Sequence, residues 1–310
     1  MAYLSELSHF IQEAGFKNKK VHSVYFGGGT PSLAKPSNIE AILNKIACLC
    51  DLSLQTEITI EANPTSIETE SLSNFQSVGI NRLSLGLQSL NDKALTALGR
   101  DHTSREGLQA LEVAKKVFAG NVNIDLIFAR MNQTPEEWQK ELQHALKLAD
   151  NHISLYELMV KSGTPLYNAY RQGKYILPKP EKVANMYETA VKLSDRHGFV
   201  QYEVSNFMRN NKYSHHNSGY WAGLDYLGIG PGAHGRITDP ISGIRKRMYN
   251  ILSPDEWMSQ CKDTGHGLRK SVVLSLHEVK DELIVFSLRS KMGMSCEQFR
   301  KFCGGQELEE

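Results

Sequence analysis

Strand-like and helix-like segments alternate through the first half of this chain, and this order limits the folds open to it. Short apolar runs rich in β-forming residues occur at 21–26, 57–62, 80–87, 122–129 and 152–158. Segments of helical period lie between them, at 38–50, 67–77, 105–118 and 135–150. Five strands separated by helices indicate right-handed βαβ units and therefore a parallel sheet. Because the runs are almost continuously apolar, we expect that sheet to be covered on both faces.

The second half has a different pattern. We expect a helix over 179–197 and a strand over 202–207, followed by a stretch at 220–235 that is too rich in glycine for a regular element. From about residue 253 the chain becomes helical and more polar, and it stops soon after a helix that begins near His277. The predicted parts are an α/β core at 1–160, an accessory region at 161–252, and the start of a helical C-terminal domain, cut short, at 253–310.

Charge and hydropathy exclude some classes of protein. The 310 residues include 35 basic and 34 acidic side chains, a balance that argues against a nucleic-acid binder. No apolar stretch approaches the roughly 20 residues needed to span a membrane. Residues 1–20 predict an amphipathic helix, with neither the apolar core of a signal peptide nor the composition of a transit peptide. We therefore expect either a cytosolic protein or a true start further upstream.

The cysteines are odd in number and scattered: Cys48, Cys50, Cys261, Cys296 and Cys303. Their spacings match neither a disulfide framework nor a metal site. Cys48 and Cys50 lie in the apolar stretch IACLCDL, where we expect buried, reduced thiols. This favours a reducing compartment.

Glycines and polar side chains stand on or just after four successive predicted strands. The glycines at 27–29 follow the first strand, Glu61 ends the second, Gln88 follows the third, and Asp125 lies on the fourth. Ligands of parallel α/β proteins bind at the carboxyl ends of the strands. Bare backbone groups and carboxylates there suit a ligand with ammonium, carboxylate and ribose hydroxyl groups. A phosphate is less suited, since GGGTP has neither GxGxxG spacing nor a P-loop lysine.

Each of these residues also has a purely structural interpretation. Glu61 could cap a helix or lie on the surface, Gln88 could be an ordinary loop residue, and Asp125 could be a buried, hydrogen-bonded carboxylate. The sequence favours a site only when the residues are taken together.

Six stretches of the first half carry a resemblance to a known family. In this order and spacing, VYFGGGTPSL, ITIEANP, INRLSLGLQSL, LGRDHT, NIDLIFA and ISLYEL resemble the radical S-adenosylmethionine (SAM) superfamily. SGTPLY, YEVSNF, HHNSGYW and DYLGIGPGAHGR resemble its branch of HemW-type heme chaperones and oxygen-independent coproporphyrinogen III oxidases. The resemblance covers about residues 2–300. It implies a partial (βα)6 barrel missing its first unit, an accessory α+β region and the start of a helical C-terminal domain.

The resemblance also implies a SAM site. Its residues would be Gly27, Gly28, Gly29, Thr30, Glu61, Gln88, Arg100 and Asp125. The glycine backbone would contact the SAM amino group, and Glu61 and Gln88 would form hydrogen bonds with the amino-acid or ribose part. Arg100 would pair with the SAM carboxylate, and Asp125 would accept hydrogen bonds from the ribose hydroxyls. An arginine fork matches a carboxylate, although a surface ion pair is the structural alternative for Arg100. Where many relatives read GLPGQ, this chain reads Ala-Arg-Met-Asn-Gln at 129–133.

The defining motif of the superfamily, CxxxCxxC, is absent from this sequence. In the family it supplies the three thiolates that hold a [4Fe–4S] cluster. Because the motif should follow the first barrel strand, we expect the chain to begin after that strand and its cluster loop. As written, the chain would bind no cluster and perform no reductive SAM cleavage.

The segment HNxxYW provides a second candidate site. By the resemblance, His216, Asn217, Tyr220 and Trp221 would bind heme, with His216 as the iron ligand. Histidine is a common axial ligand of heme iron, and aromatic rings can stack on a porphyrin. Alternatively, Tyr220 and Trp221 pack a loop against the barrel while His216 bonds the backbone.

Three functions follow from the resemblance. The first is a heme-binding carrier or chaperone of HemW type, dependent on SAM and a [4Fe–4S] cluster at full length, which HNxxYW and YEVSNF favour. The second is a radical SAM enzyme that decarboxylates a porphyrinogen, and the third is an inactive fragment without a cluster. Expected partners are heme or a porphyrin and heme-accepting proteins, in the mitochondrion or else the cytoplasm. Whether the chain is an enzyme is left open.

Overall fold

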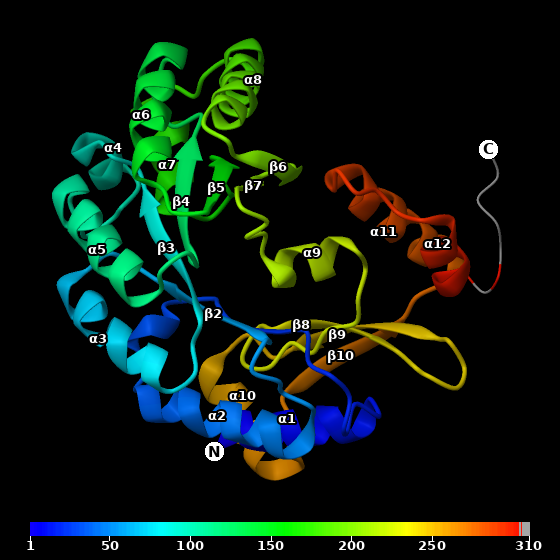
Figure 1. Cartoon of the computed structure of the whole chain (residues 1–310). Coiled ribbons are helices and arrows are strands. Elements are labelled where there is room, and N and C mark those ends of the chain that lie inside the picture. The colour runs from blue at the N-terminus through cyan, green and yellow to red at the C-terminus, as the bar shows by residue number, and fades with distance from the viewer. Residues whose placement is uncertain (304, 306–310) are drawn as a thin grey trace. The chain divides into compact units, whose positions relative to one another are not determined.

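The computed structural model describes residues 1–303 and 305 (Figure 1). The chain forms two compact units. Unit 1 comprises Met1–Val24, Ser37–Glu57 and Ser214–Glu310, and unit 2 comprises Tyr25–Pro36 and Ile58–Tyr213. The predicted division into three parts after residues 160 and 252 stays a prediction.

The helices and strands have the following bounds. The strands are β1 (Ser23–Phe26), β2 (Glu57–Ala62), β3 (Arg82–Gln88), β4 (Val122–Phe128), β5 (His152–Glu157), β6 (Val200–Glu203), β7 (Asn206–Met208), β8 (His234–Thr238), β9 (Arg245–Asn250) and β10 (Leu268–Val273). The helices are α1 (Ala2–Glu13), η1 (Pro31–Leu33, a 3₁₀ turn), α2 (Pro36–Leu49), α3 (Ser66–Ser77), α4 (Asp92–Ala97), α5 (Ser104–Val117), α6 (Pro135–Leu148), α7 (Pro165–Arg171), α8 (Pro180–Arg196), α9 (His215–Trp221), α10 (Pro254–Thr264), α11 (Leu276–Arg289) and α12 (Cys296–Phe302).

The larger sheet has the strand order β1-β2-β3-β4-β5-β7-β6. Strands β2 to β5 pair in parallel, and β7 pairs antiparallel with both β5 and β6. This curled, mostly parallel sheet with helices between its strands confirms the expected α/β partial-barrel fold (Figure 1). The strand predicted over 202–207 is wrong in detail, because two residues in the middle of this segment form a turn that separates β6 from β7.

Helices α3, α5 and α6 cover the outer side of the curled sheet in unit 2 (Figure 1). The side chains beneath them are apolar and fully buried, as Leu83, Leu85 and Leu87 of β3 illustrate. Both α5 and α6 begin with a capping box. In α6 the box joins Thr134 to Glu137 with Pro135 in the first turn, which confirms the start predicted there.

The inner face of the same strands carries polar side chains. The parallel register places Glu61 beside Ser84, Ser84 beside Asn123, and Asn123 beside His152. The last three are buried. The expectation of almost continuously apolar strands is therefore corrected: apolar and polar residues alternate, because successive side chains of a strand point to opposite faces. One face packs against helices and the other forms a polar interior.

Unit 1 contains a three-stranded antiparallel sheet of order β10-β9-β8. The buried carboxylate of Glu6 on α1 ties this unit together by accepting hydrogen bonds from Gly230 N, Asn250 Nδ2, Trp257 Nε1 and Gly267 N, at 2.7–3.0 Å. Three expectations are corrected in this unit. The N-terminal helix ends at Glu13 rather than near residue 20, β8 begins within the glycine-rich stretch, and β10 interrupts the predicted helical end.

Two expectations about burial also change. Cys48 is exposed and Cys50 is half-buried, because α2 turns Ile39, Leu43 and Ile46 toward the core and leaves Cys48 on its outer side. Strand β1, expected to be buried, is half-buried along its length because it pairs with a neighbour on one side only. Among the residues described, no helix has both the length and the apolar character needed to cross a bilayer.

Candidate functional site

The glycine loop after β1 is held by Glu61 of β2. One carboxylate oxygen of Glu61 accepts a hydrogen bond from Gly28 N at 3.2 Å, and the other accepts one from the Tyr25 hydroxyl at 2.6 Å. A Cβ atom on Gly27 would lie 2.6 Å from the Tyr25 ring and 3.1 Å from Glu61, so the close approach requires glycine there. Gly28 and Gly29 have positive φ angles and are exposed. The loop therefore presents bare backbone.

Asp125 lies in the polar interior of the sheet. Its carboxylate accepts hydrogen bonds from Ser84 Oγ at 3.0 Å and Asn123 Nδ2 at 2.8 Å. Desolvation raises the pKa of Asp125 to about 6, and these hydrogen bonds oppose the rise. The negative charge of Glu61 raises it further, which shows that the two carboxylates share one electrostatic environment.

Behind Asp125 lies a chain of hydrogen-bonded side chains that no sequence motif indicates. Asn123 Oδ1 lies 2.6 Å from His152 Nδ1, and His152 Nε2 lies 2.7 Å from the Tyr202 hydroxyl. Burial holds the pKa of His152 well below its usual value, and Arg82 adds to this effect. The ring is therefore neutral, and the amide oxygen of Asn123 requires the proton on Nδ1. The sequence signal for these residues is the polar side chain at every second position of the strands.

Gln88, Arg100 and Thr30 lie around the same end of the strands. Gln88 closes β3 with a φ of 63°, where its pairing with β4 is irregular. Arg100 follows α4, and its buried Nε has no hydrogen-bond partner among the residues that the structure describes. Thr30 stands before the 3₁₀ turn η1. The structure brings Gly28, Glu61 and Asp125 together through contacts or charge, but the described contacts do not join Arg100 or Thr30 to them.

The predicted heme residues lie in unit 1, on the short helix α9. The carboxylate of Glu57 accepts hydrogen bonds from Ser214 Oγ at 3.2 Å and from the backbone N–H groups of His215 and His216 at 3.0 Å each. Burial lowers the pKa of His216, while Glu57 acts in the opposite direction. A neutral imidazole, the form that ligates metals, is therefore favoured at neutral pH. His216 and Tyr220 lie one helical turn apart on the same side of α9.

The aromatic residues of this segment pack within unit 1. The ring of Trp221 meets Phe286 edge-on at 5.8 Å, and the Arg289 guanidinium lies 4.5 Å above it. The Tyr220 ring lies 5.9 Å from that of Phe286, and its hydroxyl accepts a hydrogen bond from Tyr226 at 3.3 Å. Helix α11 therefore supports α9 through aromatic contacts. Both rings stay half-exposed.

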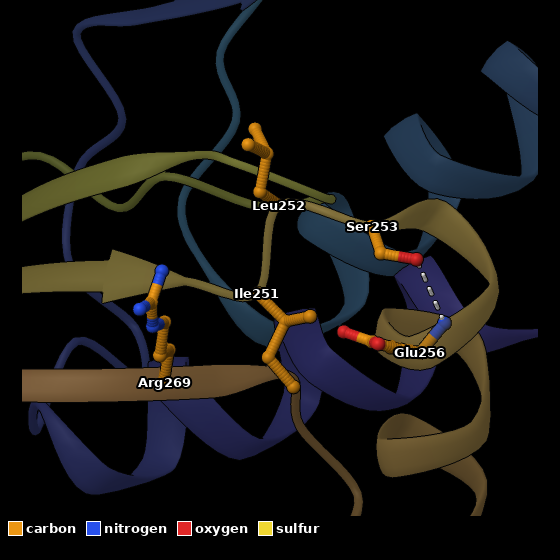
Figure 2. A pocket seen from close by; sticks show the side chains of 5 residues that line it. All are labelled: Ile251, Leu252, Ser253, Glu256 and Arg269. Atoms are coloured by element: carbon orange, nitrogen blue, oxygen red, sulfur yellow. Dashed lines mark hydrogen bonds between the residues drawn. The ribbon is translucent and has the colours of Figure 1, made fainter.

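A cavity of about 540 Å³ lies elsewhere in unit 1 (Figure 2). It is lined by Ile251, Leu252, Ser253, Glu256 and Arg269. Ser253 Oγ caps α10 by accepting a hydrogen bond from Glu256 N at 3.5 Å. The lining contains none of the predicted site residues, so this cavity adds nothing to either candidate site.

Unit 2 is thus an α/β partial barrel with a glycine loop after its first strand and the carboxylates of Glu61 and Asp125 on its inner face. A family model, the radical SAM superfamily, matches residues 4–145. The mitochondrial radical SAM domain-containing protein 1 of Bos taurus is 42% identical over 286 residues, covering 92% of this chain and 65% of that protein. The heme chaperone HemW of Lactococcus lactis is 34% identical over 309 residues, covering 99% of this chain and 79% of that protein.

The chain belongs to the radical SAM superfamily, in the family of HemW heme chaperones and mitochondrial radical SAM domain-containing protein 1. It spans less than two thirds of the length of the bovine relative. The fold is also that of the coproporphyrinogen III oxidase HemN of Escherichia coli, with a TM-score of 0.76 at 21% identity over 93% of this chain and 67% of HemN.

The superfamily implies two cofactors, SAM and a [4Fe–4S] cluster. The residues of this chain fit SAM but not the cluster. The exposed glycine backbone, the Asp125 carboxylate and Arg100 Nε, which has no partner among the residues described, suit the polar groups of SAM. The sequence has no CxxxCxxC, and no three His, Cys, Asp or Glu side chains are grouped as metal ligands in the part of the chain that the structure describes. These residues do not fit a cluster.

Proposed function

We propose that this chain is part of a heme carrier of HemW type, which binds heme at α9 and SAM in the partial barrel. The observation that carries the heme assignment is the geometry of His216. Its backbone is fixed by the Glu57 carboxylate, its pKa is lowered by burial, and Tyr220 lies one turn further along α9. The name heme chaperone, which several relatives carry, supports the same assignment.

The SAM assignment rests on the inner face of unit 2. The glycine loop would receive the amino group and Arg100 Nε the carboxylate. Asp125 would accept the ribose hydroxyls, Gln88 would bond the amino-acid or ribose part, and Glu61 would hold the loop. When bound, SAM would supply the adenosyl and methionyl groups, and the protein residues would hold and orient them. The matching donors and acceptors support this proposal.

Partners and location follow from the same reasoning. Heme or a porphyrin is the proposed ligand, and a heme-accepting protein is the proposed recipient. Relatives from Bos taurus, Danio rerio and Mus musculus carry the name mitochondrial, which supports a mitochondrial location. A porphyrinogen oxidase is the second candidate, supported by the fold shared with HemN alone.

Heme titration tests the proposal. The wild-type chain should develop a Soret band that saturates with heme, and His216→Ala should shift or weaken it. His215→Ala is the matched control, because His215 is the exposed neighbour on the same helix. Identical spectra for wild type and His216→Ala would remove His216 as the iron ligand. If no Soret band forms, the heme assignment fails. Binding of a porphyrinogen by the chain would then favour the second candidate, and binding of neither ligand would favour an inactive fragment.

A further inference from the structure

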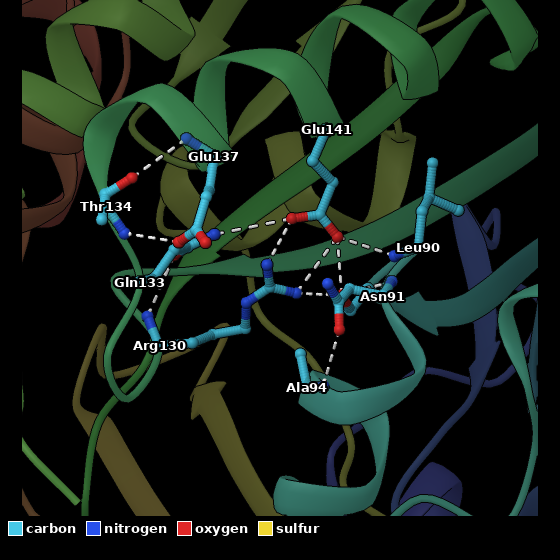
Figure 3. Close-up of polar contacts among 9 residues, drawn as sticks. Leu90, Asn91, Ala94, Arg130, Gln133, Thr134, Glu137 and Glu141 are labelled. Carbon is cyan, nitrogen blue, oxygen red and sulfur yellow. Dashed lines mark hydrogen bonds and ion pairs between the residues drawn. The ribbon is translucent and has the colours of Figure 1, made fainter.

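A buried ion pair connects α6 with the loop after β4 (Figure 3). The side chains of Arg130 and Glu141 are 6% and 9% exposed. Arg130 Nη1 donates to Glu141 Oε1 at 3.1 Å, and Nη2 donates to Oε2. Two parallel N–H···O bonds give such a pair a fixed geometry as well as a favourable energy.

The same carboxylate also holds the loop after β3. Glu141 Oε1 accepts hydrogen bonds from Ser89 Oγ at 2.6 Å and from Leu90 N at 2.7 Å. The Ser89 hydroxyl in turn accepts from Arg130 Nη1 and, at 3.0 Å, from Asn91 N. Because one carboxylate and one guanidinium bind both loops, neither loop can shift without breaking bonds that hold the other (Figure 3).

Gln88 lies immediately before this attachment and in an unusual conformation. Its φ of 63° is left-handed, which few residues other than glycine adopt. A Cβ atom on Gly86 would lie 2.7 Å from Gln88 Nε2 and 3.6 Å from Asn63 Oδ1. The Gln88 side chain therefore folds over the bare Cα of Gly86 toward the end of β2. A strained conformation of this kind persists only when surrounding contacts hold it.

The loop after β4 also contains residues in the left-handed conformation. Ala129 and Asn132 have φ angles of 55° and 57°, and Gln133 Oε1 accepts a hydrogen bond from Arg130 N at 3.1 Å. Asn132 is fixed from outside the loop, since its backbone N–H donates to Ile176 O at 2.8 Å. Arg130 thus lies between two left-handed residues and connects their loop to the one that follows Gln88.

We propose that the Arg130–Glu141 pair is a positioning device that keeps Gln88 in its left-handed conformation and thereby sets the affinity of the barrel for SAM. This inference rests on the proposed SAM site. Arg130 and Glu141 touch each other and the loops, and they act on the ligand only through Gln88. Arg130→Lys keeps the charge but removes the two-point geometry, so the loop should relax although the positive charge remains.

A double-mutant cycle on SAM binding separates this role from general stability. Equilibrium dialysis with SAM should show about 10-fold weaker binding for Arg130→Lys and for Gln88→Ala, and the double variant should bind about as weakly as either, since both act through one side chain. An approximately 100-fold loss in the double variant would show independent effects and would overturn the proposal. Arg236→Lys is the matched control, because Arg236 forms a comparable half-buried pair with Glu282 in unit 1. It should leave SAM affinity unchanged.

A readout without ligand completes the test. The amide of Leu90, which donates to Glu141, should exchange its hydrogen faster in Arg130→Lys than in the wild type, as measured by mass spectrometry. Unchanged exchange at Leu90 overturns the positioning role. Where Arg130→Lys binds SAM as tightly as the wild type does, Gln88→Ala distinguishes the two failures. If Gln88→Ala weakens binding, only the positioning role fails, and if the wild type binds no SAM, the proposed function fails with it.

Discussion

Replacing Glu57 with glutamine should detach α9 from its support and lower the stability of the chain. The carboxylate serves three donors: Ser214 Oγ and His216 N share one oxygen, and His215 N uses the other. A glutamine side chain has only one oxygen. At the position of the other carboxylate oxygen, its NH2 group would face a backbone N–H, and no hydrogen bond could form there. A hydrogen bond to a charged group contributes about 1.5–3 kcal/mol. A negative charge at a helix N-terminus adds about 0.3–1 kcal/mol.

We therefore expect Glu57→Gln to lower the free energy of unfolding by about 2–4 kcal/mol in urea denaturation. Helix α9 has only seven residues, so it has little stability of its own, and the amides of 215–221 should exchange much faster. The control is Glu106→Gln, which removes a carboxylate from the exposed capping box of α5 and should cost much less. A loss for Glu57→Gln no larger than that of the control, with unchanged exchange in α9, would refute the reasoning.

Three further predictions concern the pH dependence and the glycines. Ribose hydroxyls that donate to Asp125 favour its ionised form, so SAM affinity should rise with pH through the pKa of about 6 and level off above it. The Asp125→Asn variant should bind SAM more weakly and show no such pH dependence. Equilibrium dialysis between pH 5 and pH 8 measures both. Gly27→Ala should weaken SAM binding more than it lowers the melting temperature, because the new Cβ would push apart Tyr25 and the loop; equal SAM affinity in calorimetry would contradict this. Gly228→Ala would put a Cβ atom 1.9 Å from a backbone oxygen and should lower the free energy of unfolding by about 3 kcal/mol or more in urea denaturation. The control is Gly173→Ala, whose Cβ atom would lie in open space. It should lower the free energy of unfolding by only about 1 kcal/mol, because alanine disfavours the left-handed φ.

The sequence predicted the elements whose signals are local. The sequence predicts the correct first residue of α6, because Thr134 and Glu137 form the capping box and Pro135 favours the first position of a helix. The β6–β7 turn was missed because Val204 and Ser205 are not typical turn residues. Their turn is held by Glu203, whose Oε1 accepts from Ser205 N at 2.8 Å.

The residues missed at the two sites depend on contacts that are distant in sequence. Helix α9 is held by Glu57, a carboxylate 157–159 positions earlier, and no local pattern signals that attachment. Likewise Glu141 reads as an ordinary residue of an amphipathic helix until the fold brings Arg130 and Ser89 against it. The resemblance located the candidate residues, and only the structure gives the side chains that support them.

The position of Glu6 has a consequence for synthesis of the chain. Glu6 precedes its four hydrogen-bond donors by 224–261 positions in the sequence. On the ribosome, α1 therefore waits without its partners until Gly267 has emerged, while all of unit 2 is complete at Tyr213. Contacts of such long sequence separation form slowly, and unpaired apolar helices invite aggregation. We expect unit 2 to fold during translation and α1 to join its unit only after Gly267 has left the ribosome.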